Sequence, residues 1–245
     1  MKREAAGVEV LVLADVDIPS GDDWLDEEER STLEGLHVPK RRDEWLLGRW
    51  TAKRAVGESL GIAPEVVSIH PAPSGAPEAL VHGHPAPCAV SITHRAGLAA
   101  CAVGPPDLAL GCDLELVEPR SDGFVEEFLT EREARFVGAA PDRDLAANLV
   151  WSAKEAVLKA RRTGLRADAR SVEVSPSKAR PGGAWAPFVC IDEESEGWRG
   201  WWARREDHVL TVVSRPATPA PTELEVARSS LVRAESDRAP SDRSS

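Results

Sequence analysis

Apolar and polar residues alternate along one stretch near the middle of the chain. Between Leu110 and Leu116, apolar side chains occupy every second position, and Asp113 and Glu115 fall between them. A period of two is typical of a half-buried strand. The two acidic side chains therefore project from the same face of the predicted strand.

A second stretch repeats at helical spacing. Residues 151–160 are rich in good helix formers. Five residues fall at i, i+3, i+4, i+7 and i+8 and share one face: Trp151, Lys154, Glu155, Leu158 and Lys159. Same-face neighbours on a strand lie about 6.6 Å apart, so a helix docked there brings Glu155 to the same cation as Asp113 and Glu115. Carboxylate oxygens suit Mg²⁺, and these three acids are our expected metal site.

The rest of the pattern predicts an α+β protein. Predicted helices lie within 21–36, 43–60, 124–137 and 145–162, and predicted strands within 8–16, 66–70, 89–103, 187–191 and 209–213. Two consecutive prolines at 105 and 106 indicate a junction. We therefore expect an N-terminal lobe (1–105), a C-terminal lobe with the metal site (106–214), and a disordered tail (215–245) rich in Pro, Ala and Ser.

The chain contains an internal repeat. Residues 50–56 match residues 151–157, and the strand-like residues 67–71 resemble residues 172–176. Amphipathic helices rich in Ala and Lys can match by chance, but helix followed by strand in the same order favours a duplicated α+β unit. Arg54 then stands where Glu155 stands. One half keeps the metal carboxylate and the other supplies a cation, which gives one asymmetric site.

Composition narrows the class of protein. The 245 residues, 42% of them hydrophobic, allow a substantial core in one domain or two. A net charge of −11 argues against a nucleic-acid or membrane-surface binder, so a polyanionic ligand needs a local cationic pocket. The four cysteines form no C-x-x-C pair and are expected to be reduced. The apolar run 8–16 contains two acids and predicts a strand rather than a signal peptide, so we expect a cytoplasmic enzyme.

Five motifs together resemble the 4'-phosphopantetheinyl transferases, specifically the two-lobed surfactin-synthetase-activating (Sfp) type. They are Gly48-Arg-Trp-Thr-Ala-Lys53, Ser91-Ile-Thr-His94, Gly111-Cys-Asp-Leu-Glu115, Phe128-Leu-Thr-Glu-Arg-Glu133 and Trp151-Ser-Ala-Lys-Glu-Ala-Val-Leu-Lys159. The resemblance implies two similar α+β lobes forming an intramolecular pseudo-dimer, with coenzyme A in the cleft. It also implies Mg²⁺-dependent transfer of phosphopantetheine from coenzyme A to a serine of an acyl, peptidyl or aryl carrier protein, with release of 3',5'-ADP.

The resemblance assigns roles to individual residues. It implies Asp113, Glu115 and Glu155 at the metal, Lys154 and Lys159 at the pyrophosphate, Thr93 and His94 at coenzyme A phosphates, and Lys53, Arg49 and Arg42 near its nucleotide end. Glu155 is the first choice for the base that accepts the serine proton, and Glu133 is the second. The carrier is usually acidic in this family, and Arg161, Arg162 and Arg166 are candidate contacts for it. The chain has Gly75-Ala-Pro77 where many members have Gly-Lys-Pro, so one phosphate-contacting lysine is missing.

Two other functions remain open at this point. One is a non-catalytic module that binds carrier proteins or coenzyme A on the same fold, and the other is a Mg²⁺-dependent phosphodiester-handling enzyme of different specificity. The presence of all three carboxylates and both helix lysines favours the transferase. We expect a monomer that acts in polyketide, non-ribosomal peptide or fatty acid biosynthesis, without a nucleic-acid or membrane partner.

Overall fold

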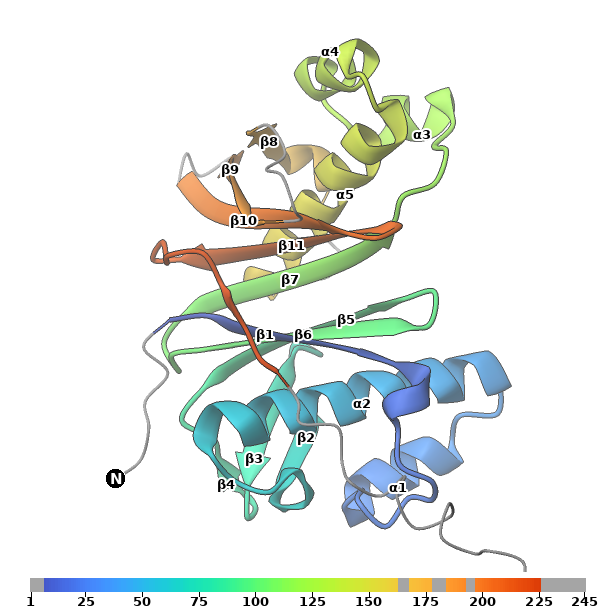
Figure 1. Cartoon of the computed structure of the whole chain (residues 1–245), viewed down its shortest axis with the longest axis vertical. Coiled ribbons are helices and arrows are strands. Elements are labelled where there is room, and N and C mark those ends of the chain that lie inside the picture. Colours follow the sequence, from blue (N-terminus) through green and yellow to red (C-terminus); the bar gives the residue numbers. More distant parts are fainter. Residues whose placement is uncertain (1–6, 163–167, 178–183, 193–196, 226–245) are drawn as a thin grey trace, which may run out of the picture.

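The computed structural model describes residues 7–162, 168–177, 184–192 and 197–225. Two mixed α+β lobes stack on each other (Figure 1). The first lobe consists of β1 (Glu9–Ala14), α1 (Glu27–Glu34), α2 (Pro39–Leu60), β2 (Val67–Pro71), β3 (Pro77–Val81), β4 (His84–Pro85), β5 (Ala89–Arg95) and β6 (Leu98–Gly104). The second consists of β7 (Ala109–Leu116), α3 (Asp122–Phe128), α4 (Glu131–Ala139), α5 (Arg143–Ala160), β8 (Val172–Pro176), β9 (Ala186–Asp192), β10 (Gly197–Arg205) and β11 (His208–Arg215). A last short strand, β12 (Thr222–Glu223), returns to the first lobe.

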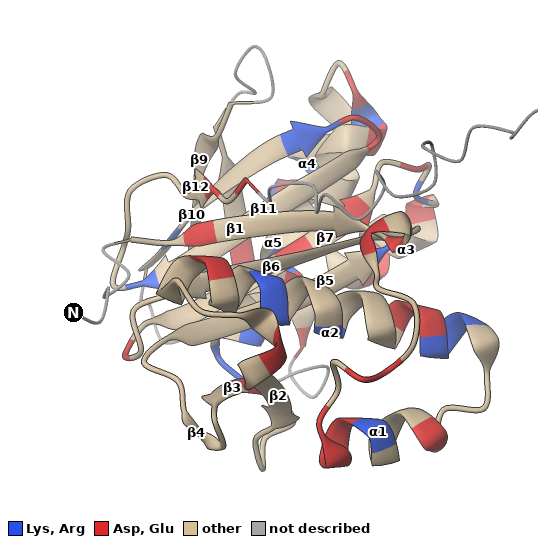
Figure 2. Ribbon diagram, turned by 60° about the horizontal axis from the view of Figure 1, so that its bottom comes forward, with Lys and Arg blue, Asp and Glu red and all other residues tan. Residues whose placement is uncertain are grey.

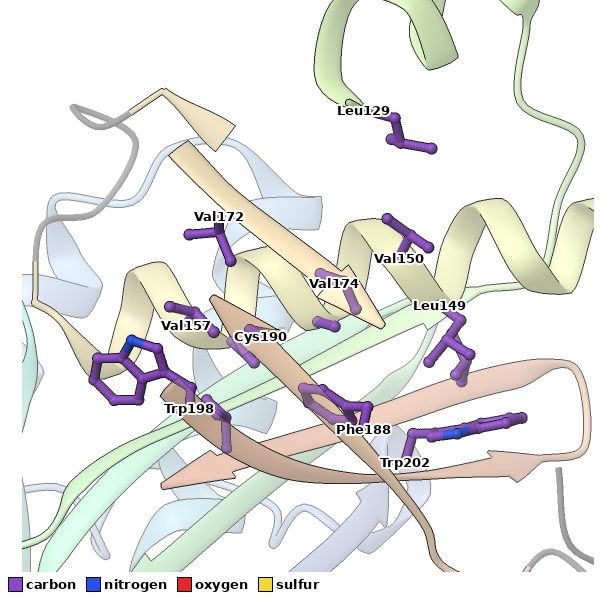
Figure 3. Packing of buried hydrophobic residues seen from close by; sticks show 14 of the residues in the cluster. Leu129, Leu149, Val150, Val157, Val172, Val174, Phe188, Cys190, Trp198 and Trp202 are labelled. Atoms are coloured by element: carbon purple, nitrogen blue, oxygen red, sulfur yellow. The ribbon is translucent and has the colours of Figure 1, made fainter. Parts of the chain in front are cut away.

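The main sheets of the two lobes form the middle layers of the molecule. The first-lobe sheet has the order β12-β1-β6-β5 and the second-lobe sheet the order β7-β11-β10-β9-β8, while β2-β3-β4 form a separate small sheet. One apolar core lies between the two main sheets. Two further cores lie under α2 and under α5, and Figure 3 shows the side chains that α5, β8, β9 and β10 contribute to the last of these. The lobes are thus held together by a continuous buried interface.

The strand registers confirm that the lobes are copies of one unit. Leu11 of β1 pairs with the fourth residue of β6, and Asp113 of β7 pairs with the fourth residue of β11. Both β6 and β11 follow two-residue turns that begin with a left-handed residue. Leu11 and Leu13 therefore stand where Asp113 and Glu115 stand in the second lobe. The acids expected at the metal therefore have no acidic counterparts at the equivalent positions of the first lobe, where Leu11, Leu13 and Arg54 stand.

Each lobe also contains the same buried ion pair. Lys53 Nζ lies 2.6 Å from Glu29 Oε2, and Lys154 Nζ lies 2.8 Å from Glu133 Oε2. Both glutamates stand third in a helix whose N-cap residue forms a capping box with them. Their second carboxylate oxygens accept hydrogen bonds from the backbone N–H groups of the small-sheet strand β2 and its counterpart β8. The pair thereby connects two helices and a strand in each lobe.

Three predicted elements differ in the structure. The single helix expected over 124–137 is two helices, because Thr130 caps a new helix at Glu131. The long helix of the first lobe begins at Pro39, with proline at its first position, rather than at residue 43. Residues 71–87, where no helix or strand was predicted, contain β3 and β4.

The expected disordered tail is ordered over its first residues. Thr222 N donates to Val8 O and Leu224 N donates to Val10 O, so β12 extends the first-lobe sheet parallel to β1. Leu224 packs against the first-lobe core. The prediction of disorder is therefore wrong for residues 215–225, and residues 226–245 lie outside the described residues.

Candidate active site

Helix α5 crosses β7 at Gly111. An ideal Cβ built there would lie 1.8 Å from Ala156 O, so any side chain would force the helix away from the strand. This close approach brings the C-terminal half of α5 onto the acidic strand. Lys159 Nζ donates to Asp113 Oδ1 at 2.7 Å and to Cys112 O at 3.2 Å. The glycine of the G-x-D-x-E motif thus sets the distance between the two motifs.

Two buried carboxylate oxygens at this crossing have no hydrogen-bond partner in the part of the chain that the structure describes. Asp113 is 5% exposed, and its Oδ1 accepts from Lys159 and from Thr93 Oγ1 at 3.2 Å. Its Oδ2, and Oε1 of Glu155, are buried and accept no hydrogen bond from the described residues. An unpaired buried acceptor is costly. Both atoms therefore fit a ligand that supplies positive charge.

The charges of these acids act on one another. Burial raises the pKa of Glu155, and Asp113 and Glu115 raise it further by repulsion. Burial and Asp113 likewise raise the pKa of Glu115. Burial works against the charge of Lys159, but Asp113, Cys112 and Glu155 together outweigh it and raise the pKa of that ammonium. Negative charge accumulates at one place, as expected where a cation binds.

Glu115, the third expected metal ligand, is bound by other side chains of the protein. Glu115 Oε1 accepts from Trp151 Nε1 at 3.0 Å, and its Oε2 lies 3.0 Å from Arg120 Nη2 and 3.5 Å from Arg95 Nε. Within the described ranges, no three acidic, histidine or cysteine side chains surround a common metal position. Asp113 and Glu155 fit a hard cation, whereas Glu115 is held by two arginines. Mg²⁺ commonly uses only one or two protein carboxylates together with substrate phosphates and water.

Neither Arg95 nor Arg120 was among the residues expected from the sequence. Arg120 Nε also donates to Asn148 Oδ1 at 2.7 Å, and Arg95 Nη2 pairs with Glu118. Arg95 belongs to the first lobe and reaches Glu115 only because β5 lies along β7. No local sequence signal marks this contact, since it is a product of lobe packing.

Four expected site residues lie elsewhere. Lys154 and Glu133 are completely buried against each other, and Lys154 Nζ also donates to two backbone carbonyls. Lys53 is buried in the equivalent pair of the first lobe. Arg42 Nη1 donates to Leu33 O at 2.9 Å. These contacts hold elements of each lobe together, and the roles that the resemblance implies for these four side chains stay predictions.

Two adjoining cavities form a cleft beside the acids. The first, of about 230 Å³, is lined by Trp45, Arg49 and His94 from the first lobe. The second, of about 290 Å³, is lined by residues of both lobes, including Lys159 and Arg162. They share the Gly75-Ala-Pro77 turn and Ile92, so they form one continuous path from α2 to the end of α5.

The cationic and histidine side chains of the cleft differ in the protein groups that they contact. The Arg49 guanidinium stacks on Trp45 at 4.8 Å, and its buried Nε has no hydrogen-bond partner among the described residues. The surrounding protein desolvates His94 and lowers its pKa, so the ring is neutral near pH 7 and offers one N–H donor. Arg162 pairs with Glu78 across the lobes at 3.1 Å. Thr93 points to Asp113 instead of the cleft, and Arg166 lies outside the described residues.

Two family models match the chain along most of its described length. The model of the 4'-phosphopantetheinyl transferase superfamily matches residues 109–213, and the model of the 4'-phosphopantetheinyl transferase N-terminal domain matches residues 29–104. The chain belongs to the 4'-phosphopantetheinyl transferase superfamily. The successive matches fall on the two lobes, and this two-domain architecture indicates the Sfp type.

Other comparisons are more distant. A crystal structure of Thermotoga maritima holo-[acyl-carrier-protein] synthase is 22% identical, with a TM-score of 0.32, over 51% of this chain and 75% of that chain. No curated protein sequence matches significantly. None of the helices in the described ranges has the length and apolar character needed to cross a bilayer.

Proposed function

We propose that the protein transfers 4'-phosphopantetheine from coenzyme A to a serine of an acyl, peptidyl or aryl carrier protein, releasing 3',5'-ADP. The observation that carries this proposal is a pair of buried oxygens, Asp113 Oδ2 and Glu155 Oε1, which accept no hydrogen bond from the described residues and lie next to Lys159, a residue of the cleft lining. Membership of the transferase superfamily supports the same reaction. Carrier proteins of polyketide, non-ribosomal peptide or fatty acid synthesis in the cytoplasm are the proposed substrates, and the pseudo-dimer acts as a monomer.

The reaction exchanges one phosphorus–oxygen bond for another. The serine oxygen attacks the phosphorus next to pantetheine, the bond from that phosphorus to the bridging oxygen breaks, and 3',5'-ADP leaves with that oxygen. The serine proton passes to a base, for which Glu155 is our choice because its buried Oε1 accepts no hydrogen bond from the described residues. Glu133 is a poor second choice, because it is buried against Lys154.

Charge neutralisation is the main task of the site. Lys159 stays charged beside Asp113 and lines the cleft, so it can approach a phosphate oxygen. Asp113 and Glu155 would hold Mg²⁺, which supplies neutralisation of phosphate charge when bound. Arg120 and Arg95 fix Glu115, and Thr93 fixes Asp113. These contacts hold the carboxylates of Glu115 and Asp113 in fixed positions, so they need not rearrange during the reaction.

The nucleotide end of coenzyme A fits the first-lobe half of the cleft. Arg49 offers a buried N–H that has no hydrogen-bond partner among the described residues, and the neutral His94 offers one more donor to a phosphate oxygen. No lysine stands at the Gly75-Ala-Pro77 turn. The phosphates are therefore bound by fewer cations than in relatives with Gly-Lys-Pro, so we expect a higher KM for coenzyme A than in those relatives.

Mass spectrometry of carrier proteins tests the function. The full chain is incubated with coenzyme A, Mg²⁺ and a panel of apo carrier proteins, and the carrier serine should gain the mass of phosphopantetheine. Asp113→Asn should abolish the gain, whereas Glu65→Gln, an exposed acid beyond the end of α2, should not. Absence of a mass gain with every carrier would leave the non-catalytic binding module as the better account. Separate calorimetric titrations with coenzyme A and with ATP distinguish the transferase from a Mg²⁺-dependent phosphodiester-handling enzyme of other specificity.

A further inference from the structure

The end of α5 brings a second cation to the wall of the cleft that carries Lys159. Arg162 follows the last turn of the helix, and its backbone is left-handed, with a φ of 55°. Few residues other than glycine adopt this conformation. The N–H of Arg162 donates to Lys159 O at 2.9 Å. This turn keeps both side chains on one wall, since Lys159 and Arg162 line the same cavity of about 290 Å³.

Another wall of this cavity is the turn formed by residues 74–77 of the first lobe. Its residues are Ser, Gly, Ala and Pro, so the turn itself carries no charged side chain. The next residue, Glu78, belongs to β3 and contacts the second lobe, because its Oε1 lies 3.1 Å from Arg162 Nη1. One ion pair thus joins the two lobes beside the cavity.

The ion pair between Glu78 and Arg162 can be exchanged for another contact. Both side chains are about half exposed, at 52% for Arg162 and 51% for Glu78. Exposed ion pairs contribute little to stability, because water solvates the separated charges well. A phosphate group accepts two parallel hydrogen bonds from a guanidinium, which is a stronger contact. A phosphate that enters the cavity can therefore replace Glu78 at Arg162.

Positive charge is scarce around the cleft. The chain has a net charge of −11, and Figure 2 shows Asp and Glu interspersed with Lys and Arg along α1 and α2. Lys159 is bonded to the buried Asp113, and Arg49 stacks on Trp45. Among the described lysines and arginines that line the two cavities of the cleft, only Arg162 is paired with an exposed acid. It is therefore the cation that an anionic ligand can recruit most easily.

We propose that Arg162 binds a phosphate of coenzyme A, and that Glu78 holds the guanidinium at the cleft until the phosphate takes the place of its carboxylate. This rests on the proposed transferase function, which puts coenzyme A in the cleft. It gives Arg162 a ligand other than the carrier protein expected from the sequence. Because the phosphate competes with Glu78, the ion pair raises the KM for coenzyme A above that of a chain with a free arginine at this position.

Calorimetric titration of the full chain with coenzyme A measures this contact. Arg162→Gln should weaken binding about tenfold, since it removes a charge-assisted hydrogen bond. Glu78→Gln should strengthen binding about threefold, because the arginine then has no acid to leave. Arg162→Lys keeps the charge without the planar fork and should fall between R162Q and the unmodified chain. In transfer assays the same changes should appear in the KM for coenzyme A with kcat unchanged, because the contact strengthens ground and transition states alike.

A cation placed on the turn provides a rescue. Ala76 lines the same cavity, so Ala76→Lys adds an ammonium close to where the guanidinium is removed. The double variant A76K/R162Q should recover most of the affinity that R162Q loses. The same titrations with 3'-dephospho-coenzyme A identify the phosphate. A loss confined to coenzyme A assigns Arg162 to the 3'-phosphate, a loss with both ligands assigns it to the pyrophosphate, and either result supports the contact.

Controls separate this proposal from the function it rests on. Arg132 forms a similar surface ion pair with Glu173 at 2.9 Å and lines neither cavity, so Arg132→Gln should leave the affinity for coenzyme A unchanged. Unchanged affinity in R162Q would overturn the proposal. Equal weakening in R162Q and E78Q would also overturn it, because the pair would then only hold the two lobes together. The titrations contain no carrier protein, so they report on Arg162 whether or not transfer occurs. Transfer with an unchanged KM for coenzyme A in R162Q would refute the contact and leave the proposed function intact.

Discussion

Lys154→Met leaves a buried carboxylate without its cation. Both side chains of the Lys154–Glu133 pair are 0% exposed, and Lys154 Nζ also donates to Ala169 O at 3.0 Å and to Val172 O at 2.5 Å. Removing one partner of such a pair costs about 3 to 5 kcal/mol. That is a large part of the roughly 5 to 15 kcal/mol by which a domain is stable. We therefore expect a strongly destabilised protein that still folds at low temperature.

Activity distinguishes this structural role from contact with the pyrophosphate. Urea denaturation gives the loss of stability, and transfer assays below the unfolding transition give the rate per folded molecule. The folded Lys154→Met protein should keep kcat and the KM for coenzyme A within about threefold, because Lys154 does not line the cleft. A variant of unchanged stability with a rate reduced by a factor of a hundred would refute the reasoning.

Two matched variants strengthen the test. Lys53→Met removes the equivalent cation of the first lobe, beside Glu29, and should lower stability by a similar amount. The double variant Lys154→Met with Glu133→Gln removes the buried charge while keeping a side-chain oxygen for Val174 N–H. It should recover part of the lost stability. Failure to recover would mean that packing, not charge, dominates the loss.

Further predictions concern the acidic crossing. Gly111→Ala should destabilise the chain by at least the 1 to 3 kcal/mol typical of overpacking, because the added Cβ meets the Ala156 carbonyl, and thermal unfolding should show a lower Tm. Glu155→Gln should not lower stability without metal, since repulsion is relieved, but Mg²⁺ should no longer raise Tm, and a preserved Mg²⁺ shift would remove Glu155 from the metal site. The raised pKa values of Glu115 and Glu155 mean that the metal-free chain loses stability as pH rises through them. Mg²⁺ binds the deprotonated acids, so its stabilisation should grow over the same pH range, and a pH-independent Mg²⁺ effect in thermal scans would contradict this.

Sequence periodicity was sufficient to predict the strand with Asp113, the helix with Glu155, and their meeting. The period of each segment is set locally, and Gly111 adds the close approach. Residue type alone did not predict the position of Lys154. Its neighbour Glu155 faces the candidate site, whereas Lys154 faces the core. Which residues of a helix face the core depends on where the sheet packs against it. The pattern of apolar residues does not reveal this for Lys154, because its charge is paired with that of Glu133 inside the lobe.

Contacts between the lobes were the least predictable part. Arg95 reaches Glu115 only after β5 has been placed along β7, and nothing near either residue in the sequence indicates the other. For a similar reason, the sequence did not predict that residues 222–223 form an ordered strand. Its Pro- and Ser-rich surroundings indicate disorder, yet backbone hydrogen bonds to Val8 and Val10 and the partial burial of Leu224 hold it.

The pairing of β12 with β1 has a consequence for how the protein is made. β1 is synthesised well before β12, so the edge of β1 opposite β6 stays open until Thr222 and Glu223 have left the ribosome. Its other edge is covered by β6 of the same lobe, so the first lobe can fold early around α2. The exposed edge is then a site for pairing with another nascent chain. Thr222 and Glu223 pair with Glu9 and Val10 and cover the start of this edge, so the edge gains its protection there only after the second lobe has been made.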